Sequence, residues 1–129
     1  NLAIASSEGI YKLNIKTDTR ELVAPLEGDM PGNRSNDGRV GPSGSFWIST
    51  MAAADPRTNA SGALYCVRDG SVTRLRGDLH IPNATCFAPD GKRAYFTDGA
   101  TRRRPPASSR STPARGGCAA SSSSQSVST

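Results

Sequence analysis

The residues of this sequence that could bind or react with a ligand lie mainly in two short polar stretches. Arg34 and Asn36 belong to the first, and Asn83 belongs to the second. Arginine offers a fixed fork of N–H donors and asparagine offers a donor and an acceptor, so these side chains can hydrogen-bond a polar ligand. Each also has a local explanation, because Arg34 could pair with an acid at a sheet edge and the asparagines could serve turns.

Other reactive patterns are absent or weak. The sequence has no G-x-S-x-G elbow and no G-x-G-x-x-G loop, which removes serine hydrolases and dinucleotide-binding proteins from consideration. His80 has no His or Glu partner at metal-ligand spacing, so we interpret it as a loop residue, and we interpret Asp98 as a residue that holds a turn. Cys66, Cys86 and Cys118 form no C-x-x-C pair, which favours free thiols in a reducing compartment over a disulfide framework or a thiolate zinc site.

The composition divides the chain of 129 residues into two unlike parts. Residues 101–129 hold five arginines and no acid, so residues 1–100 carry 11 basic and 11 acidic side chains and are neutral. Small and apolar residues (A, V, I, L, M, F, W, C and Gly) make up 47 of the first 100 positions but only 8 of the last 29, so only the first part can build a core. No apolar run is long enough to span a bilayer.

The last part, residues 101–129, is rich in Arg, Ser, Pro and Ala. Such a segment cannot bury enough apolar surface to offset its chain entropy, so we expect it to be disordered. Its arginines have no aromatic neighbours and no helical spacing, which argues against nucleic-acid binding. A frameshift near residue 102 would also produce this composition, and a real linker or a phosphorylatable basic tail are the alternatives.

Residues 1–100 predict an all-β fold. Short apolar runs are separated by Gly, Pro, Asp and Asn every 8 to 12 residues or so, and no convincing amphipathic helix occurs. Asp69-Gly70 is a strong hairpin signal. We expect nine strands: Leu2–Ser6, Gly9–Asn14, Arg20–Pro25, Asp37–Gly41, Phe46–Thr50, Gly62–Arg68, Ser71–Arg76, Ala84–Ala88 and Ala94–Asp98.

A repeat gives these strands an architecture. The segment from Asp37 to Thr50 recurs from Ala84 to Asp98, with Pro42 and Pro89 47 positions apart. A period of about 50 residues with four short strands per unit is typical of a β-propeller blade. The strands then form the last three strands of one blade, one complete blade and the first two strands of a third. A nine-stranded antiparallel sandwich is the alternative.

Two motifs identify a family resemblance. The stretch N-R-S-N-D-G-R-V at residues 33–40, followed by P-S-G and F-W-I-S-T-M up to Met51, resembles the SMP-30/gluconolactonase/regucalcin family. The stretch I-P-N-A-T-C-F-A-P-D-G-K-R-A-Y-F-T-D at residues 81–98 is similar to a second motif of that family. The resemblance covers residues 1–99 and implies a six-bladed β-propeller, of which residues 1–100 would be an incomplete antiparallel piece.

The resemblance also implies a function and assigns roles to the polar residues. It implies a hydrolase that opens sugar lactones with one divalent cation, Ca, Zn, Mn or Mg, and no nucleic-acid or membrane partner. Asn83 would bind the metal through its side-chain oxygen, a donor type that hard cations prefer, while Arg34 and Asn36 would bind the sugar lactone. The metal would polarise the lactone carbonyl or activate a water.

The chain departs from the family pattern in ways that affect the site. By resemblance, a metal-binding glutamate would precede this segment and the general-base aspartate would follow residue 100, so both are absent and we expect the chain to be inactive alone. Gly41, Ser49 and Ala84 replace the usual Asp, Gly and Gly. The alternative function is a non-enzymatic propeller module that binds a metal or a protein. A cytoplasmic location is favoured, and secretion stays open because the chain begins at Asn1 without a native amino terminus.

Overall fold

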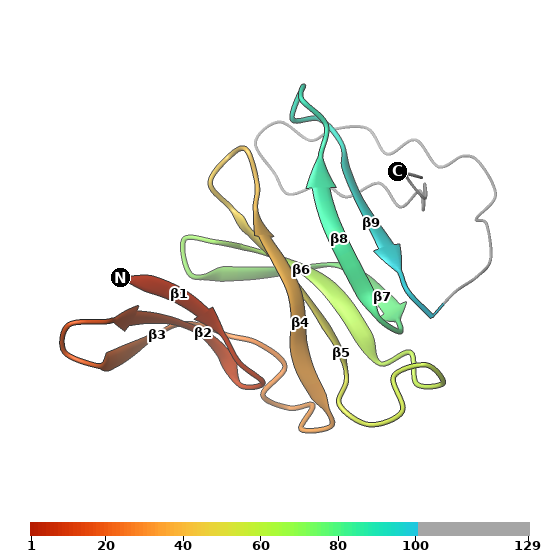
Figure 1. Ribbon diagram of the computed structural model, residues 1–129, viewed down its shortest axis with the longest axis horizontal. Helices are drawn as coiled ribbons and strands as arrows, with labels where there is room; N and C mark the ends of the chain where they lie inside the picture. Colours follow the sequence, from red (N-terminus) through yellow and green to blue (C-terminus); the bar gives the residue numbers. More distant parts are fainter. Residues whose placement is uncertain (101–129) are drawn as a thin grey trace.

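The computed structural model describes residues 1–100, which form nine strands in three antiparallel sheets (Figure 1). The first sheet has three strands, the second has four and the third has two, and the order of strands in each sheet follows the chain. Hairpins therefore make every pairing, as the turn signals predict. The strands are β1 (Leu2–Ala5), β2 (Gly9–Asn14), β3 (Thr19–Pro25), β4 (Asn33–Val40), β5 (Phe46–Ala52), β6 (Gly62–Arg68), β7 (Ser71–Leu79), β8 (Pro82–Phe87) and β9 (Ala94–Asp98).

The all-β fold and its nine strands confirm the sequence prediction, but two strand starts differ in a way that matters for the site. β4 begins at Asn33 and β8 begins at Pro82, four and two residues earlier than expected. Asn, Asp and Gly are rare in strands, which is why the sequence favoured loops there. Pairing of β4 with β5 and of β8 with β9 overrides that preference, so Arg34, Asn36 and Asn83 all lie within strands.

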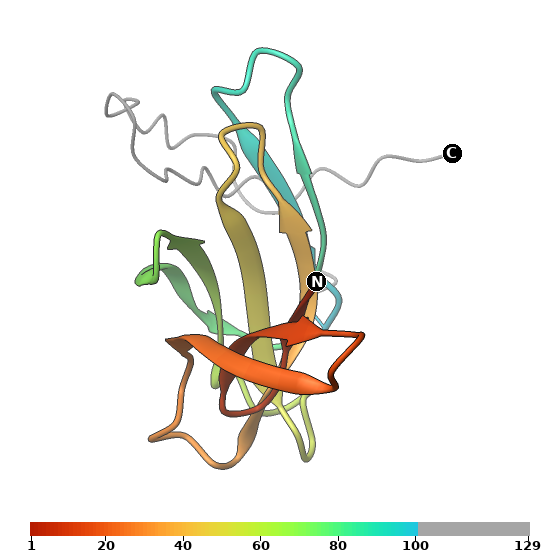
Figure 2. The same ribbon diagram turned by 90° about the vertical axis from the view of Figure 1, so that its left-hand side faces the viewer.

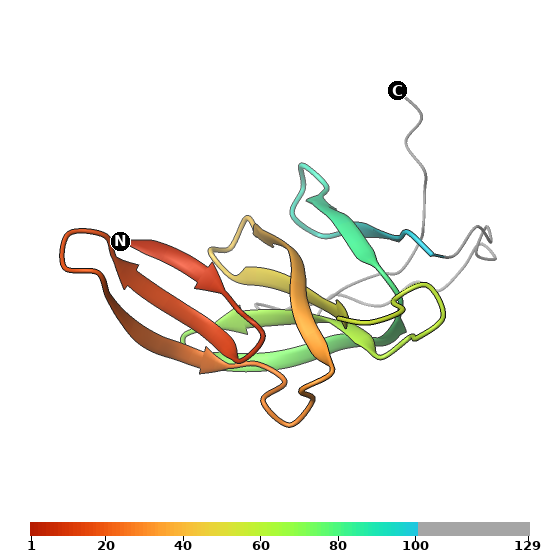
Figure 3. The same cartoon turned by 60° about the horizontal axis from the view of Figure 1, so that its bottom comes forward.

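The two middle strands of the four-stranded sheet, β5 and β6, are buried on both faces, and their side chains pack against the other two sheets. Side chains alternate across a strand, so Ile48 of β5 packs with Ile10 of the first sheet. Its neighbour Trp47 packs on the opposite face with Phe96 of the third sheet, and its ring meets Phe87 edge to face at 5.1 Å. Figures 2 and 3 show the three sheets following one another along the chain, with the central sheet between the other two.

The sheet sizes agree with the predicted β-propeller architecture and leave the alternative, a nine-stranded sandwich, without support. Three, four and two strands are the numbers that the predicted end of one blade, complete blade and start of a third blade require, and this division into blades stays a prediction. β4 and β8, the first strands of the second and third sheets, lie side by side (Figure 1). The polar residues singled out above are therefore on neighbouring strands of different sheets.

The cysteines differ from the sequence prediction in one respect. Cys86 is an exposed free thiol, as expected. Cys66, buried on β6, is disulfide-bonded, so the expectation of free thiols is wrong for this residue. The pairing of cysteines cannot be deduced from their spacing in a sequence, and for that reason the sequence did not reveal the bond. The tail prediction falls on residues 101–129, which lie outside the described residues.

Candidate functional site

The site is built where β4 and β8 approach each other, and each of these strands carries a β-bulge there. On β4, Asn36 and Asp37 together oppose the single residue Ser49 of β5. On β8, Ala84 and Thr85 together oppose Phe96 of β9. A bulge bends its strand and redirects the side chains beside it. The bulges therefore re-aim the asparagine of each strand, Asn36 within the first bulge and Asn83 directly before the second.

The two asparagines meet across the blade boundary, although 47 positions separate them in the chain. Asn36 Nδ2 donates to the backbone carbonyl of Pro82 at 2.8 Å and lies 3.4 Å from Asn83 Oδ1. Both side chains are half-buried. The side chain of Asn36 thus spans two blades instead of closing its own turn, which argues against the local explanation for this residue.

Arg34 lies on β4, two positions before Asn36, and its side chain is exposed. Its guanidinium donates to the carbonyl of the neighbouring Ser35 at 3.1 Å. Among residues 1–100 no carboxylate forms an ion pair with Arg34, so the alternative of an acid at a sheet edge finds no support there. The remaining N–H donors of this group face solvent and are accessible to a ligand.

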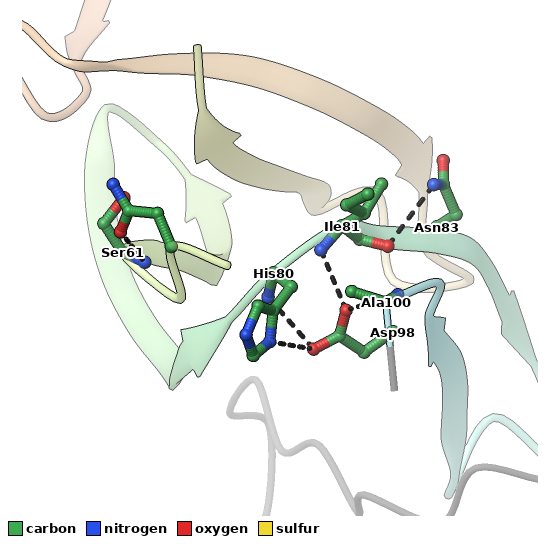
Figure 4. Close-up of polar contacts among 7 residues, drawn as sticks. Ser61, His80, Ile81, Asn83, Asp98 and Ala100 are labelled. Atoms are coloured by element: carbon green, nitrogen blue, oxygen red, sulfur yellow. Dashed lines mark hydrogen bonds and ion pairs between the residues drawn. The ribbon is translucent and has the colours of Figure 1, made fainter. Parts of the chain in front are cut away.

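Asn83 is held by its backbone and its side chain. Its carbonyl accepts a hydrogen bond from Thr97 Oγ1 at 3.2 Å. Its Nδ2 donates to the carbonyl of Ile81 at 3.4 Å (Figure 4). Its Oδ1 therefore points away from Ile81, toward Asn36. This is the orientation that an asparagine needs to offer oxygen to a cation.

Asp37 and Ser49 support the two strands, and the sequence did not identify either as a site residue. Ser49, which is buried, hydrogen-bonds the backbone N–H and carbonyl of Asp37 and also reaches the carbonyl of Pro82 at 3.2 Å. Asp37 Oδ2 accepts the N–H of Thr85 at 3.2 Å. The only sequence signal was the change from the family's Gly to Ser49, because Asp37 resembles an ordinary turn residue.

Asp98 holds the connection between β7 and β8, as the sequence predicted for a turn-holding residue. Its carboxylate accepts the backbone N–H groups of His80 and Ile81 at 3.0 and 2.8 Å, and His80 Nδ1 lies 3.5 Å from it (Figure 4). Burial works to raise the pKa of Asp98, but the backbone donors of His80, Ile81 and Ala100, with His80 adding a smaller contribution, outweigh it and lower the pKa below the ordinary value.

A second carboxylate, Glu27, joins the first blade to the second at some distance along the sequence from these motifs. It accepts hydrogen bonds from Asn33 Nδ2, Thr50 Oγ1 and Tyr65 Oη at 3.0, 2.9 and 2.6 Å. Burial raises the pKa of the Tyr65 hydroxyl, and the hydrogen bond to Glu27 raises it further. Because both of its oxygens are engaged by neutral donors, Glu27 serves as a structural acceptor.

The described residues offer the oxygen ligand type that a hard cation prefers, but they supply only part of the ligands that such a cation needs. Residues 1–100 contain no group of three or more His, Cys, Asp or Glu side chains that could hold a metal ion. Asn83 Oδ1 is a neutral oxygen with one long contact, to Asn36. A Ca²⁺ ion takes six to eight oxygens, so Asn83 fits as one ligand among several.

No helix in this part of the chain has the length and apolarity to cross a membrane.

Several known proteins are similar to this chain in sequence. A family model described as the SMP-30/Gluconolactonase/LRE-like region matches residues 1–108. A protein of Rhizobium meliloti (strain 1021), named provisionally as a sugar lactone lactonase, is 45% identical over 95 residues, which cover 74% of this chain and 31% of that protein. The 6-deoxy-6-sulfogluconolactonase of Pseudomonas putida is 33% identical over 96 residues, covering 74% of this chain and 32% of the enzyme.

A solved structure shows the same arrangement. The crystal structure of regucalcin from Agrobacterium tumefaciens str. C58, described as a calcium-binding protein, superposes with a TM-score of 0.69 at 47% identity, over 74% of this chain and 32% of that chain. The chain thus spans about a third of the length of the relatives it matches. Its three sheets and paired asparagines define a segment of a β-propeller with a polar site between neighbouring blades. The chain belongs to the SMP-30/gluconolactonase/LRE-like family.

Proposed function

We propose that this chain is part of a metal-dependent hydrolase of sugar lactones, in which Arg34 and Asn36 bind the sugar and Asn83 supplies one metal ligand. The observation that carries the proposal is the pairing of Asn36 with Asn83 at 3.4 Å across the blade boundary. This contact places a hydrogen-bonding side chain directly beside a potential metal ligand. A lactone bound to Asn36 would therefore lie next to the cation.

Arg34 and Asn36 would make different hydrogen bonds to the sugar. The exposed guanidinium of Arg34 donates to sugar hydroxyl or carbonyl oxygens, and the free Oδ1 of Asn36 accepts from a sugar hydroxyl, while its Nδ2 stays on Pro82. A divalent cation, Ca, Zn, Mn or Mg, would supply Lewis acidity toward the lactone carbonyl or a bound water. The names of two relatives support a sugar lactone as substrate, and the calcium-binding regucalcin supports a cation.

We expect the 129-residue chain to be inactive by itself, because among residues 1–100 no cluster of His, Cys, Asp or Glu side chains completes the ligand shell around Asn83. A longer protein that contains this segment and the remaining blades would hold the complete site. The cytoplasmic location favoured by the sequence stays a prediction that cell fractionation can test.

The test is lactone opening, measured with gluconolactone and each of the four cations. We expect activity from the longer protein, none from this chain, and a loss of at least about 100-fold in kcat/KM for Asn83→Ala in the longer protein, since a lost metal ligand removes transition-state stabilisation. Asn59→Ala is the matched control, because Asn59 is exposed in the β5–β6 loop and bonds only its own turn.

Two outcomes would contradict the proposal. Full activity of Asn83→Ala would show that Asn83 is not a metal ligand. Lactone opening by the 129-residue chain would show that the remaining blades are not required. A longer protein that binds the cation through Asn83 but opens no lactone would instead favour the non-enzymatic module.

A further inference from the structure

We propose that Asp98 is a positioning residue for Asn83: it fixes the connection that precedes β8, so that the Asn83 amide presents its oxygen and not its nitrogen to the site. The inference rests on the proposed function, in which Asn83 is a metal ligand. Neither the family motifs nor the relatives assign such a role to Asp98. Its role follows from a chain of contacts at the open end of the β8–β9 pair (Figure 4).

The first contacts join Asp98 to the backbone before β8. Asp98 Oδ1 accepts the N–H of Ile81 at 2.8 Å, and Oδ2 accepts the N–H of His80 at 3.0 Å. The side chain of Asp98 is only 12% exposed, which strengthens hydrogen bonds to a charged acceptor. Because each oxygen accepts one of these backbone N–H groups, the carboxylate orients the main chain before β8.

The next contacts pass from Ile81 to Asn83. Gly99, which follows Asp98, donates its N–H to the carbonyl of Ile81 at 2.9 Å. Both sides of Ile81 are therefore held by the end of β9, its N–H by Asp98 and its carbonyl by Gly99. The same Ile81 carbonyl accepts Asn83 Nδ2 at 3.4 Å, and Thr97 Oγ1 holds the carbonyl of Asn83.

These contacts decide which atom of the amide faces the site. Rotation of the Asn83 amide by half a turn would present its NH₂ group, which cannot bind a cation. In the observed rotamer the nitrogen has an acceptor in Ile81, and the oxygen points away, toward Asn36. The flipped amide would set its oxygen against the Ile81 carbonyl. A well-placed Ile81 thus selects the rotamer that binds metal, and Asp98 keeps Ile81 in place.

The experiment compares Asp98→Ala and Asp98→Asn with wild type in the ¹⁵N-labelled 129-residue chain, using NMR signals of the Asn83 side-chain amide. Asp90→Asn is the matched control, because Asp90 also accepts a backbone N–H but lies in the hairpin at the other end of the β8–β9 pair. We expect Asp98→Ala to move the Asn83 amide signals toward those of a free amide and to speed their hydrogen exchange about 10-fold, whereas Asp90→Asn leaves them unchanged. Asp98→Asn keeps one acceptor oxygen and should be intermediate.

Mn²⁺ titration of the longer protein that contains the remaining blades provides a second measurement, through paramagnetic broadening of the Asn83 signals. We expect Asp98→Ala to weaken the apparent Mn²⁺ affinity about 10-fold or more, the range typical for loss of a partner that orients a ligand. A merely structural role would lower the unfolding midpoint without selectively changing the Asn83 amide at temperatures where the chain is folded.

The outcomes separate this inference from the proposed function. Unchanged Asn83 signals in Asp98→Ala, with faster exchange at His80 and Ile81 alone, would overturn the positioning role even if Mn²⁺ binds. If Asp98→Ala does not fold, unchanged Asn83 signals in Asp98→Asn overturn it in the same way. Absence of Mn²⁺ broadening at Asn83 in the longer wild-type protein would count against the proposed function, while the amide signals of the 129-residue chain would still decide the positioning role.

Discussion

Ala84 adopts a backbone conformation that normally requires glycine, the residue that the family motif has at this position. It directly follows Asn83 and has a φ of 56°, in the left-handed region where a Cβ crowds the backbone. The family motif places Gly here, which adopts this conformation without strain. The bulge next to Asn83 therefore requires a glycine-like backbone, and this chain forms it with an alanine.

Replacing Ala84 by Gly should stabilise the fold. Relief of the left-handed strain is worth about 1–2 kcal/mol, and the greater freedom of Gly in the unfolded chain takes back about half of this gain. We expect a net increase of about 0.5–1 kcal/mol in the free energy of unfolding, measured by urea denaturation. Ala3→Gly on β1, where φ is negative, should have the opposite sign. A loss of stability in Ala84→Gly would show that the conformation carries no strain.

The residues that bind and those that support the site were not equally predictable. Arg34, Asn36 and Asn83 stood out because they match family motifs, whereas their residue types alone favoured local roles in turns or at a sheet edge. Asp37 and Ser49 did not, since their roles depend on which backbone groups come near them. The contacts of Ser49 with Asp37 and Pro82 join residues 12 and 33 positions away. No pattern within one sequence predicts such partners.

At the scale of elements, the strands with strong apolar patterns were predicted well and the polar ones were not. β6 (Gly62–Arg68) has the predicted bounds, because its run of buried side chains reads directly from the sequence. β4 extends over Asn33–Asp37, where five polar residues favour a loop. Hydrogen bonding to β5 makes this segment a strand, and its bulge turns Asn36 toward β8. The part of the fold that the sequence missed is thus the part that forms the site.

Asp98 joins the β7–β8 connection to the end of β9, and this link should depend on pH. Because the pKa of Asp98 is lowered in the folded chain, the unfolded chain binds more protons at acidic pH. The stabilisation is complete above the ordinary pKa of 3.8 and is lost as pH falls through the folded value. The difference in unfolding free energy between wild type and Asp98→Asn should therefore be largest near neutral pH and shrink below about pH 4.

Thermal unfolding between pH 2 and 7 measures this difference. Asp90→Asn is again the control, and as an exposed substitution it should change the stability by less than about 0.5 kcal/mol at neutral pH. A constant difference between wild type and Asp98→Asn over the whole range would show that the carboxylate adds no charge-dependent stability.

The whole molecule consists of sheets that are each stabilised by a neighbouring blade. Strands β5 and β6 of the central sheet are buried on both faces, but the first sheet is covered on one face only, where Ile10 and Ala24 are buried. Its other face carries Leu2, Ile4 and Leu22, which are 56%, 39% and 52% exposed. The register aligns Ile4, Tyr11 and Leu22 in one row, so these residues form a continuous apolar strip. In longer relatives of this family, a preceding blade would cover such a face.

The apolar strip predicts that the 129-residue chain associates with itself through the first sheet. Among residues 1–100 no strand pairs with the outer edge of β1, so this edge offers backbone groups beside the strip, and such edges favour intermolecular pairing. Leu22→Lys places a charge within the strip and should reduce self-association, measured as weight-average mass against concentration by analytical ultracentrifugation. Ile15→Lys is the matched control: Ile15 is 62% exposed but lies in the β2–β3 turn, away from the strip. Because both variants add the same charge, an equal effect of the two would show that net charge and not the strip controls the association. A monomeric wild type would contradict the prediction that the chain associates through its first sheet.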